Sequence, residues 1–416
     1  MSMTAVADGA EPRTRCPSCD SKDLHPFYEV SGVPAHSCIL LPTREEAVAC
    51  PIGDVRLEFC PTCGVISNTR FDPTSIDYSH DYEETQGFSP RFRSFALELA
   101  ERLVDRYDLH GKDVLEIGCG KGEFLALMCT LGGNRGLGID PSFVPERVDP
   151  AAASTMHVLR ESFSPKHVDV ETDLLCCRHT LEHIPDVGAF MRLVAQVMRN
   201  RARTPAFFEV PDVRRVLREV AFWDIYHEHC SYFSAGSLAR LFRGQDMRPV
   251  HLGTGFDDQY LLIDAVVAGT HPGRILDLEE TIDALAIDVE HFRRRHRSVI
   301  DGWRERIGGL HRDGRRIVLW GSGSKAVAFL TTLGLEREVD CVVDVNPFRH
   351  GMYMAGTGQP IVSPGHLAEH RPDVVVVMNP IYRKEIEGEL ARMGITAEVL
   401  VLEPAEDPSG SATTAS

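Results

Sequence analysis

Hydrophobic residues recur along this chain in two patterns, one typical of amphipathic helices and one typical of buried strands. Residues 92–109 carry apolar positions at helical spacing. Short apolar runs follow at 113–117, 172–177 and 206–210, and a helical stretch at 187–198 separates the last two. Strands that alternate with helices in this way predict a doubly wound α/β sheet.

A second α/β pattern occupies the C-terminal quarter. The letters RRIVLWGSGSKAVAFLTTLGL predict a strand, a glycine-rich turn and a helix, and CVVDVNP predicts a strand that ends at Asp344. VVVVMNP at 374–380 predicts a third strand. Residues 274–306, between the two patterns, predict one or two charged helices, whose arginine run FRRRHR we interpret as a solvated face.

Composition and charge exclude several classes of protein. The 416 residues are 43% hydrophobic and 25% charged, as in soluble globular proteins, and suffice for two or three domains. The net charge of −17 argues against a nucleic-acid surface. No apolar run is long enough to span a membrane, and the N-terminus lacks the apolar core of a signal peptide. We therefore expect a cytoplasmic protein that uses its twelve cysteines as thiols and metal ligands.

Two CxxC pairs near the N-terminus predict a metal site. The letters CPSC contain Cys16 and Cys19, and CPTC contains Cys60 and Cys63. Two such knuckles complete a tetrahedral four-thiolate site, so we predict one structural Zn²⁺ and no open position for chemistry. His36, Cys38 and Cys50 lie in the intervening loop and are weaker candidate ligands.

A glycine-rich segment follows the first predicted strand of the central pattern. Glu116 precedes three alternating glycines, and a second strand, GLGID, ends at Asp140. Such glycines let the backbone approach a ligand, and the acid can bind ribose hydroxyls. The E-x-G-x-G-x-G spacing favours S-adenosylmethionine over a nicotinamide cofactor. The residues that we expect to bind the cofactor are Tyr82, Glu116, Gly118, Gly120, Gly122, Asp140 and His179.

Polar residues cluster just after the strand at 172–177, in RHTLEHIPD. Because the carboxyl ends of strands border the ligand crevice, Arg178, His179, Glu182 and His183 are placed to line it. The alternative is that they only cap the next helix.

The segment IYHEHCSYF at 225–233 places two histidines around a glutamate. The spacing differs from that of HExxH zinc sites, whose histidines share one helix face. A helix would separate His227 from His229 and would pair Tyr226 with His229, three residues apart. The alternative is a polar helix end or turn with solvated histidines.

The glycine turn of the C-terminal pattern leaves three interpretations open. Gly321, Gly323 and Asp344 suit a second dinucleotide site, a packing turn without a cofactor, or a substrate site. Because the methyl donor already occupies the first sheet, we expect substrate here, with Lys325 and Asn379 among its contacts.

These patterns predict an α/β protein with a small N-terminal zinc-binding domain, a central Rossmann-like cofactor domain and a C-terminal Rossmann-like βαβ domain. The boundaries are, in order, 1–14 (disordered), 15–75 (zinc-binding), 76–270 (methyltransferase), 271–309 (helical linker), 310–404 (substrate-binding) and 405–416 (disordered tail).

This order of parts resembles the sugar C-methyltransferase family, whose members methylate a ring carbon of dTDP-linked 4-keto sugars. The paired CxxC, EIGCGKGEF and IYHEHCSYFS carry the resemblance, which covers about residues 16–402. It implies that His229 is the catalytic base and that Tyr226, Glu228 and His183 line the active site. A histidine near working pH can remove the proton from a carbon next to a ketone, and a nearby donor can stabilise the enolate.

The chain also departs from the family pattern. It has WGSGSKAV at 320–327 where the family has a GYGAxAKG-type turn, and YEETQGF at 82–88 where the family has a serine-rich stretch. The resemblance therefore supports the family's reaction more strongly than its substrate. We expect the substrate to be a small molecule, a nucleotide-linked ketosugar. Two rival interpretations are an O- or N-methyltransferase and a non-catalytic zinc-containing interaction protein. The sequence does not determine the oligomeric state.

Overall fold

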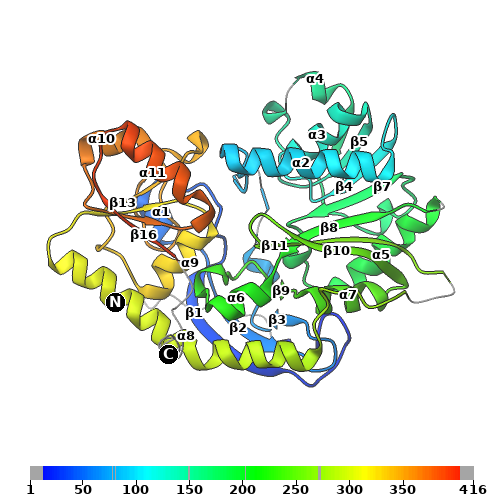
Figure 1. Cartoon of the computed structure of the whole chain (residues 1–416), viewed down its shortest axis with the longest axis horizontal. Helices are drawn as coiled ribbons and strands as arrows, with labels where there is room; N and C mark the ends of the chain where they lie inside the picture. The colour runs from blue at the N-terminus through cyan, green and yellow to red at the C-terminus, as the bar shows by residue number, and fades with distance from the viewer. Residues whose placement is uncertain are drawn as a thin grey trace, which may run out of the picture.

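The computed structural model describes residues 13–402 apart from 77, 80, 149, 202 and 270–272. The expected disordered segments fall almost entirely outside this part of the chain. Three β-sheets, of four, seven and five strands, organise the described residues (Figure 1). The predicted α/β class with three folded parts is confirmed.

The N-terminal sheet has the strand order β1-β2-β3-β9. Its first three strands are β1 (His25–Pro34), β2 (Ile52–Phe59) and β3 (Ile66–Asn68), with α1 (Arg44–Val48) between β1 and β2. The fourth, β9 (Ser231–Tyr232), comes from the IYHEHCSYF segment and pairs antiparallel with β3. The histidine-rich segment is therefore anchored to the N-terminal part of the chain.

The central sheet has the order β10-β11-β8-β7-β4-β5-β6. Its strands are β4 (Asp113–Ile117), β5 (Arg135–Ile139), β6 (Met156–Leu159), β7 (Leu174–Arg178), β8 (Ala206–Pro211), β10 (Met247–Gly255) and β11 (Tyr260–Val267). Strands β4 to β8 are parallel, whereas β11 runs antiparallel to β8 and to β10. The predicted strands are all present, and β7 begins two residues later than expected.

Helices cover both faces of the central sheet. Apolar side chains of α2 (Pro90–Tyr107) and α3 (Glu123–Gly132) share one core with one face. Side chains of α5 (Val187–Asn200) and α7 (Ala235–Arg243) share another core with the opposite face. The short helices α4 (Pro150–Ala153) and α6 (Val213–Glu219) complete this part.

The C-terminal sheet is parallel throughout, with the order β14-β13-β12-β15-β16. Its strands are β12 (Ile317–Trp320), β13 (Cys341–Val343), β14 (Ile361–Val362), β15 (Val374–Val377) and β16 (Glu398–Val401). Its helices are α9 (Ser324–Leu333), α10 (Leu367–His370) and α11 (Arg383–Arg392). The three predicted strands are present, and β14 and β16, which the pattern did not indicate, extend the sheet at either edge.

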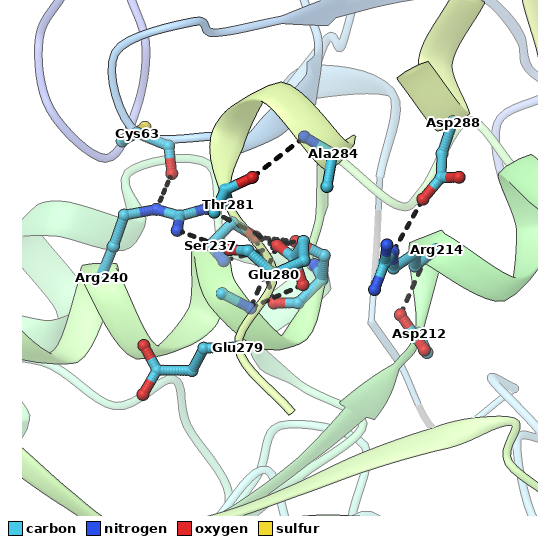
Figure 2. Close-up of polar contacts among 12 residues, drawn as sticks. Cys63, Asp212, Arg214, Ser237, Arg240, Glu279, Glu280, Thr281, Ala284 and Asp288 are labelled. Atoms are coloured by element: carbon cyan, nitrogen blue, oxygen red, sulfur yellow. Dashed lines mark hydrogen bonds and ion pairs between the residues drawn. The ribbon is translucent and has the colours of Figure 1, made fainter. Parts of the chain in front are cut away.

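One long helix, α8 (Ile282–Arg312), connects the central and C-terminal parts along the lower edge of Figure 1. It is not only a solvated linker, because Phe292 is fully buried and packs edge-on against Phe27 and Tyr28 of β1. Figure 2 shows the anchor at its start, where the Glu280 carboxylate accepts hydrogen bonds from the residues that begin α7. Arg240 of α7 donates to the carbonyl oxygen of Cys63 at 2.8 Å, which joins this anchor to the second CxxC knuckle.

Candidate active site

A cavity of about 720 Å³ lies where the three parts of the chain meet. It is lined by residues that follow β4, β5 and β7 and by residues that follow β12, β13 and β15. The carboxyl ends of the parallel strands of both sheets therefore face one space, which is where α/β sheets bind ligands. Cys38, part of the segment 78–92 and residues between 211 and 229 also line it.

The glycine-rich loop between β4 and α3 forms part of the cavity wall on the side of the central sheet. Gly118, Gly120 and Gly122 all have positive φ, between 52° and 81°, which disfavours other residues. A Cβ on Gly118 would lie 1.9 Å from Thr180 Oγ1. Gly122, which we expected to bind the cofactor, does not line the cavity. It instead permits close packing, because a Cβ there would lie 3.0 Å from Met156 Cε.

Two acids frame this loop. Glu116 lies in the cavity wall, and one of its buried carboxyl oxygens has no hydrogen-bond partner in the described chain. Burial raises its pKa to about 7, although Arg178 opposes this. Asp140 accepts hydrogen bonds from the backbone N–H groups of Gly120 at 2.8 Å and Ser142 at 2.7 Å. The glycine loop leaves its backbone open to a ligand, and the carboxylates of Glu116 and Asp140 lie beside it. This arrangement fits S-adenosylmethionine.

Residues 82–89 form a strap that joins the two halves of the cavity. The carbonyl of Tyr82 accepts a hydrogen bond from Lys121 of the glycine loop at 2.7 Å. The Glu83 carboxylate accepts from Arg147 at 2.8 Å and from Asn346 of the C-terminal domain at 2.9 Å. Glu84 lies over the glycine loop, and burial raises its pKa to about 7. The strap thus contacts both the central and the C-terminal sides of the cavity.

The segment after β7 places charged groups in the cavity wall, as predicted. His179 has a φ of 47° and contacts Glu209 of β8 through Nε2 at 3.1 Å. Burial opposes its protonation, but Glu209 and Glu182 raise its pKa to about 9. His179 is therefore in its positively charged imidazolium form at neutral pH and is unsuited to act as a base.

The segment 225–233 is a turn followed by a short strand, not a helix, and its histidines are buried rather than solvated. Three successive side chains point in three directions. His227 stacks on Phe71 and contacts the Asp54 carbonyl through Nδ1 at 3.0 Å, outside the cavity lining. Glu228 accepts a hydrogen bond from the Tyr82 hydroxyl at 3.2 Å, behind the cavity wall. Of these three side chains, His229 alone lines the cavity, beside Tyr226 of the same segment.

Aromatic rings surround His229. Its ring lies edge to face with His183, at a centroid distance of 4.7 Å, and with Tyr226, at 4.8 Å. The expected pairing with Tyr226 is thus present, although a turn and not a helix produces it. Burial, helped by His183, lowers the pKa of His229 to about 4, so the ring is neutral at physiological pH.

His183 and Glu182 complete the arrangement around this base. The Tyr78 hydroxyl lies 2.8 Å from His183 Nδ1. Ligand atoms of Glu182, His183 and His229 lie within 4.8 Å of one another. Such a group can move protons or hold a divalent cation.

Tyr226 has a second set of contacts through its hydroxyl, which donates to Asp224 Oδ1 at 2.9 Å. The same carboxylate is paired with the ammonium of Lys325, at the start of α9. Lys325, expected to contact substrate, lines the cavity but already has this partner.

The C-terminal half of the cavity repeats the acid–loop geometry of the first half. Asp344 accepts from the backbone N–H of Ser322 at 2.8 Å, as Asp140 does from Gly120. Asn379, also expected to contact substrate, lines the cavity and exchanges two 3.0 Å amide hydrogen bonds with Gln259 of the central domain.

The four cysteines of the CxxC pairs converge away from the cavity. Their sulfur atoms all lie within 4.8 Å of one another, with Cys16 and Cys63 3.5 Å apart and Cys19 and Cys60 3.6 Å apart. Tetrahedral Zn²⁺ places thiolate sulfurs about 3.8 Å apart, so the set fits zinc. Cys38 and Cys50 do not belong to this cluster.

Several cavity residues escaped the sequence interpretation. Tyr78, Glu84, Asp224, Gln259 and Arg349 all line it. Only Asp224 carried a signal, because it directly precedes the histidine-rich segment. The others lie in segments whose polar residues resemble those of any surface loop.

Comparison with known proteins is consistent with this architecture. Two family models match, a methyltransferase domain at residues 90–252 and a C-methyltransferase C-terminal domain at residues 274–401. The C-methyltransferase NovU of Streptomyces niveus is 29% identical over 398 residues, 92% of this chain and 93% of that protein. The ubiquinone biosynthesis O-methyltransferase of Escherichia coli is 29% identical over 133 residues, 29% of this chain and 52% of that protein.

Among solved structures, an N1-methyltransferase of Burkholderia thailandensis with bound 1,6-didemethyltoxoflavin and S-adenosylhomocysteine matches with 19% identity and a TM-score of 0.34. The match covers 42% of this chain and 79% of that one.

In the described part of the chain, no helix has the length and apolarity needed to cross a membrane. The two family models and a relative that spans both chains show that the protein is an S-adenosylmethionine-dependent methyltransferase, and they support the sugar C-methyltransferase family.

Proposed function

We propose that the protein methylates a carbon next to a carbonyl group, with His229 as the base that forms the enolate. The observation that carries this proposal is the neutral, cavity-facing imidazole of His229, held between His183 and Tyr226. Oxygen and nitrogen acceptors have lone pairs, whereas a carbon must first lose a proton. A buried neutral base beside a donor is the arrangement that this step requires.

His229 takes the α-proton, and the electrons of that C–H bond form the enolate double bond while the carbonyl π electrons move to oxygen. We assign the stabilisation of that oxygen to His183. If the Tyr78 hydroxyl donates to Nδ1, the N–H of His183 lies on Nε2 and is free to donate in turn. Tyr226 is less suited to this role, because its hydroxyl already donates to Asp224.

The cofactor half of the cavity positions the methyl donor. We assign Glu116, Gly118, Gly120 and Asp140 to S-adenosylmethionine, with Tyr82 and His179 in the adjoining wall. When bound, S-adenosylmethionine supplies an electrophilic methyl group to the nucleophilic carbon. Zn²⁺ at Cys16, Cys19, Cys60 and Cys63 would stabilise the N-terminal domain without taking part in the reaction.

The acceptor that we propose is a small molecule, a nucleotide-linked ketosugar, bound across the C-terminal half of the cavity. The turn at 321–325 and Asn379 line this half. The chain is similar over nearly its whole length to a C-methyltransferase, whereas the O-methyltransferase relative matches under a third of it.

Product NMR tests the proposal. The enzyme is incubated with ¹³C-methyl-labelled S-adenosylmethionine and dTDP-4-keto-deoxysugars, and the carbon shift of the new methyl shows whether it is bonded to carbon, oxygen or nitrogen. A methyl on oxygen or nitrogen would favour the rival enzyme class. Absence of S-adenosylmethionine binding in calorimetry would instead favour a non-catalytic protein.

A further inference from the structure

A chain of polar contacts leads from the C-terminal domain to the ring beside the base. Lys325, in the first turn of α9, pairs with Asp224 Oδ1, the same oxygen that accepts from the Tyr226 hydroxyl. Arg215 of α6 contacts the other carboxylate oxygen at 3.2 Å. Asp224 therefore joins a side chain of the C-terminal domain, a side chain of the central domain and the aromatic neighbour of His229.

The Asp224 carboxylate is largely buried and yet is held in its charged form. The side chains of Asp224 and Lys325 are 11% and 19% exposed. Burial opposes ionisation of Asp224, but Lys325 and Arg215 outweigh it and lower its pKa. Removing one partner of such a pair leaves the other charge uncompensated, so the contact strongly favours one arrangement of the two domains.

The backbone around Asp224 is docked on the same helix of the C-terminal domain. Asp224 ends a short 3₁₀ turn, Phe222–Asp224, and the ring of Phe222 stacks on Phe329 of α9 with centroids 6.1 Å apart. On the other side, the Tyr232 hydroxyl contacts both the N–H and the carbonyl of Tyr226, at 3.1 and 3.0 Å. Tyr226 is thus clamped between β9 and α9.

We infer that Asp224 is a positioning residue which, through its ion pair with Lys325, fixes Tyr226 against His229 only when the C-terminal domain is docked. The inference rests on the proposed function and adds a coupling to it. Because α9 begins at the turn that lines the substrate half, an acceptor bound there stabilises the same arrangement that aligns the base. Lys325 then acts on the rate through Asp224 and not mainly as an acceptor contact.

A double-mutant cycle between Asp224→Asn and Tyr226→Phe tests this coupling. A small misplacement of a catalytic group can lower the rate about 100-fold, and we expect Asp224→Asn to lower kcat by up to this factor. The Km for the acceptor and the Kd for S-adenosylmethionine should change less than about threefold. The double variant should be no slower than Tyr226→Phe alone, because both changes remove the same interaction. Multiplicative effects would overturn the inference.

The lysine is tested in the same way. Lys325→Met should lower kcat, and Lys325→Arg should restore much of it, because it keeps a cation beside Asp224. If Lys325→Met instead raises Km with kcat unchanged, the lysine is an acceptor contact and the inference fails.

Asp288→Asn is the matched control. It removes the ion pair of Asp288 with Arg214 of α6, at 2.7 Å (Figure 2), and the one with Arg218, at 3.0 Å. Asp288 does not line the cavity. We expect kcat within about threefold of wild type, as for a contact away from the reacting groups. An equal loss in this variant would mean that any ion pair of the domain junction matters, which would overturn a specific role for Asp224.

Solvent-deuterium exchange at the acceptor α-carbon, with S-adenosylhomocysteine in place of the donor, separates the inference from the proposed function. If wild-type enzyme exchanges no proton, the proposed function fails. If wild type exchanges and Asp224→Asn exchanges as fast, only the inference fails.

Discussion

The imidazoles of His183 and His229 lie edge to face, with their ring centroids 4.7 Å apart. They belong to segments that are distant in the chain, and the hydrogen bond from Cys230 N–H to the Glu182 carbonyl, at 2.9 Å, joins these segments next to the rings. Burial, helped by His183, disfavours protonation of His229 and lowers the pKa of its ring.

We predict that His229→Ala lowers turnover by about two to four orders of magnitude, as loss of a general base does. Calorimetry should show unchanged S-adenosylmethionine affinity. Solvent-deuterium exchange at the acceptor carbon, run with S-adenosylhomocysteine, isolates the affected step.

His227→Ala is the control for this change. His227 contacts the Asp54 carbonyl and packs against Gly53, outside the cavity lining, so its loss should affect stability more than proton abstraction. If the His229→Ala enzyme exchanges the proton at the wild-type rate, another group is the base, and Tyr226 and His183 are the next candidates.

The pH dependence of kcat/Km should reflect the lowered pKa of His229. Burial lowers this pKa to about 4, so the His229 imidazole is neutral above that pH. Its neutral, basic form is lost as the pH falls through about 4. We therefore predict an acid limb well below 6.5, the pKa of an unperturbed histidine. An acid limb at or above 6.5 would be incompatible with a buried neutral base.

The lowered pKa of His229 also makes folding stability depend on pH, in a direction that can be stated. Between about 4 and 6.5 the unfolded chain binds a proton at this histidine and the folded chain does not. Folding stability should therefore rise with pH across this interval, and His229→Gln should flatten the rise, as measured by urea unfolding at several pH values.

We predict one zinc ion per chain, bound by the four-cysteine cluster. Cys60→Ser should remove the metal and lower the melting temperature, because thiolate ligation contributes directly to folding free energy. Elemental analysis and calorimetric melting measure both effects. Cys50→Ser, a buried cysteine of the same loop outside the cluster, should keep its zinc. Purified wild-type protein without zinc would refute this assignment.

The glycine loop should determine methyl-donor affinity. A valine at Gly120 would occupy a backbone conformation with a φ of 52° and place its Cβ 2.4 Å from Glu84 Oε1. We expect Gly120→Val to abolish S-adenosylmethionine binding in calorimetry and Asp140→Ala to weaken it, while melting temperatures show that both variants fold. Binding that survives both changes would show that the methyl donor lies elsewhere.

The C-terminal half should control affinity for the acceptor and hold no redox cofactor. Gly323 has a φ of −78°, and a Cβ there would meet nothing within 4 Å, so a larger residue is tolerated by the backbone. Gly323→Leu should raise the acceptor Km while the Kd for S-adenosylmethionine stays unchanged. NAD or NADP bound in this domain, or hydride transfer by the enzyme, would contradict the assignment.

Much of the fold was predictable because its signals are local. Apolar runs such as 113–117 are buried on both faces of a parallel sheet, and the glycine turns after them need backbone conformations that other residues avoid. The N-terminal sheet was not predictable. Its fourth strand, β9, is two residues long and pairs with a partner far away in the chain.

Sequence alone was enough to predict the order of the three parts, the four CxxC cysteines that converge and the position of the glycine loop, because local patterns within short segments indicate each of them. The side chains of IYHEHCSYF that reach the cavity, Tyr226 and His229, could be identified only from the tertiary structure. The turn at His227 and Glu228 exists because β9 pairs with the N-terminal sheet and Asp224 pairs with Lys325. Neither partner is close in sequence, so no local pattern could indicate that His227 and His229, two residues apart, have different surroundings.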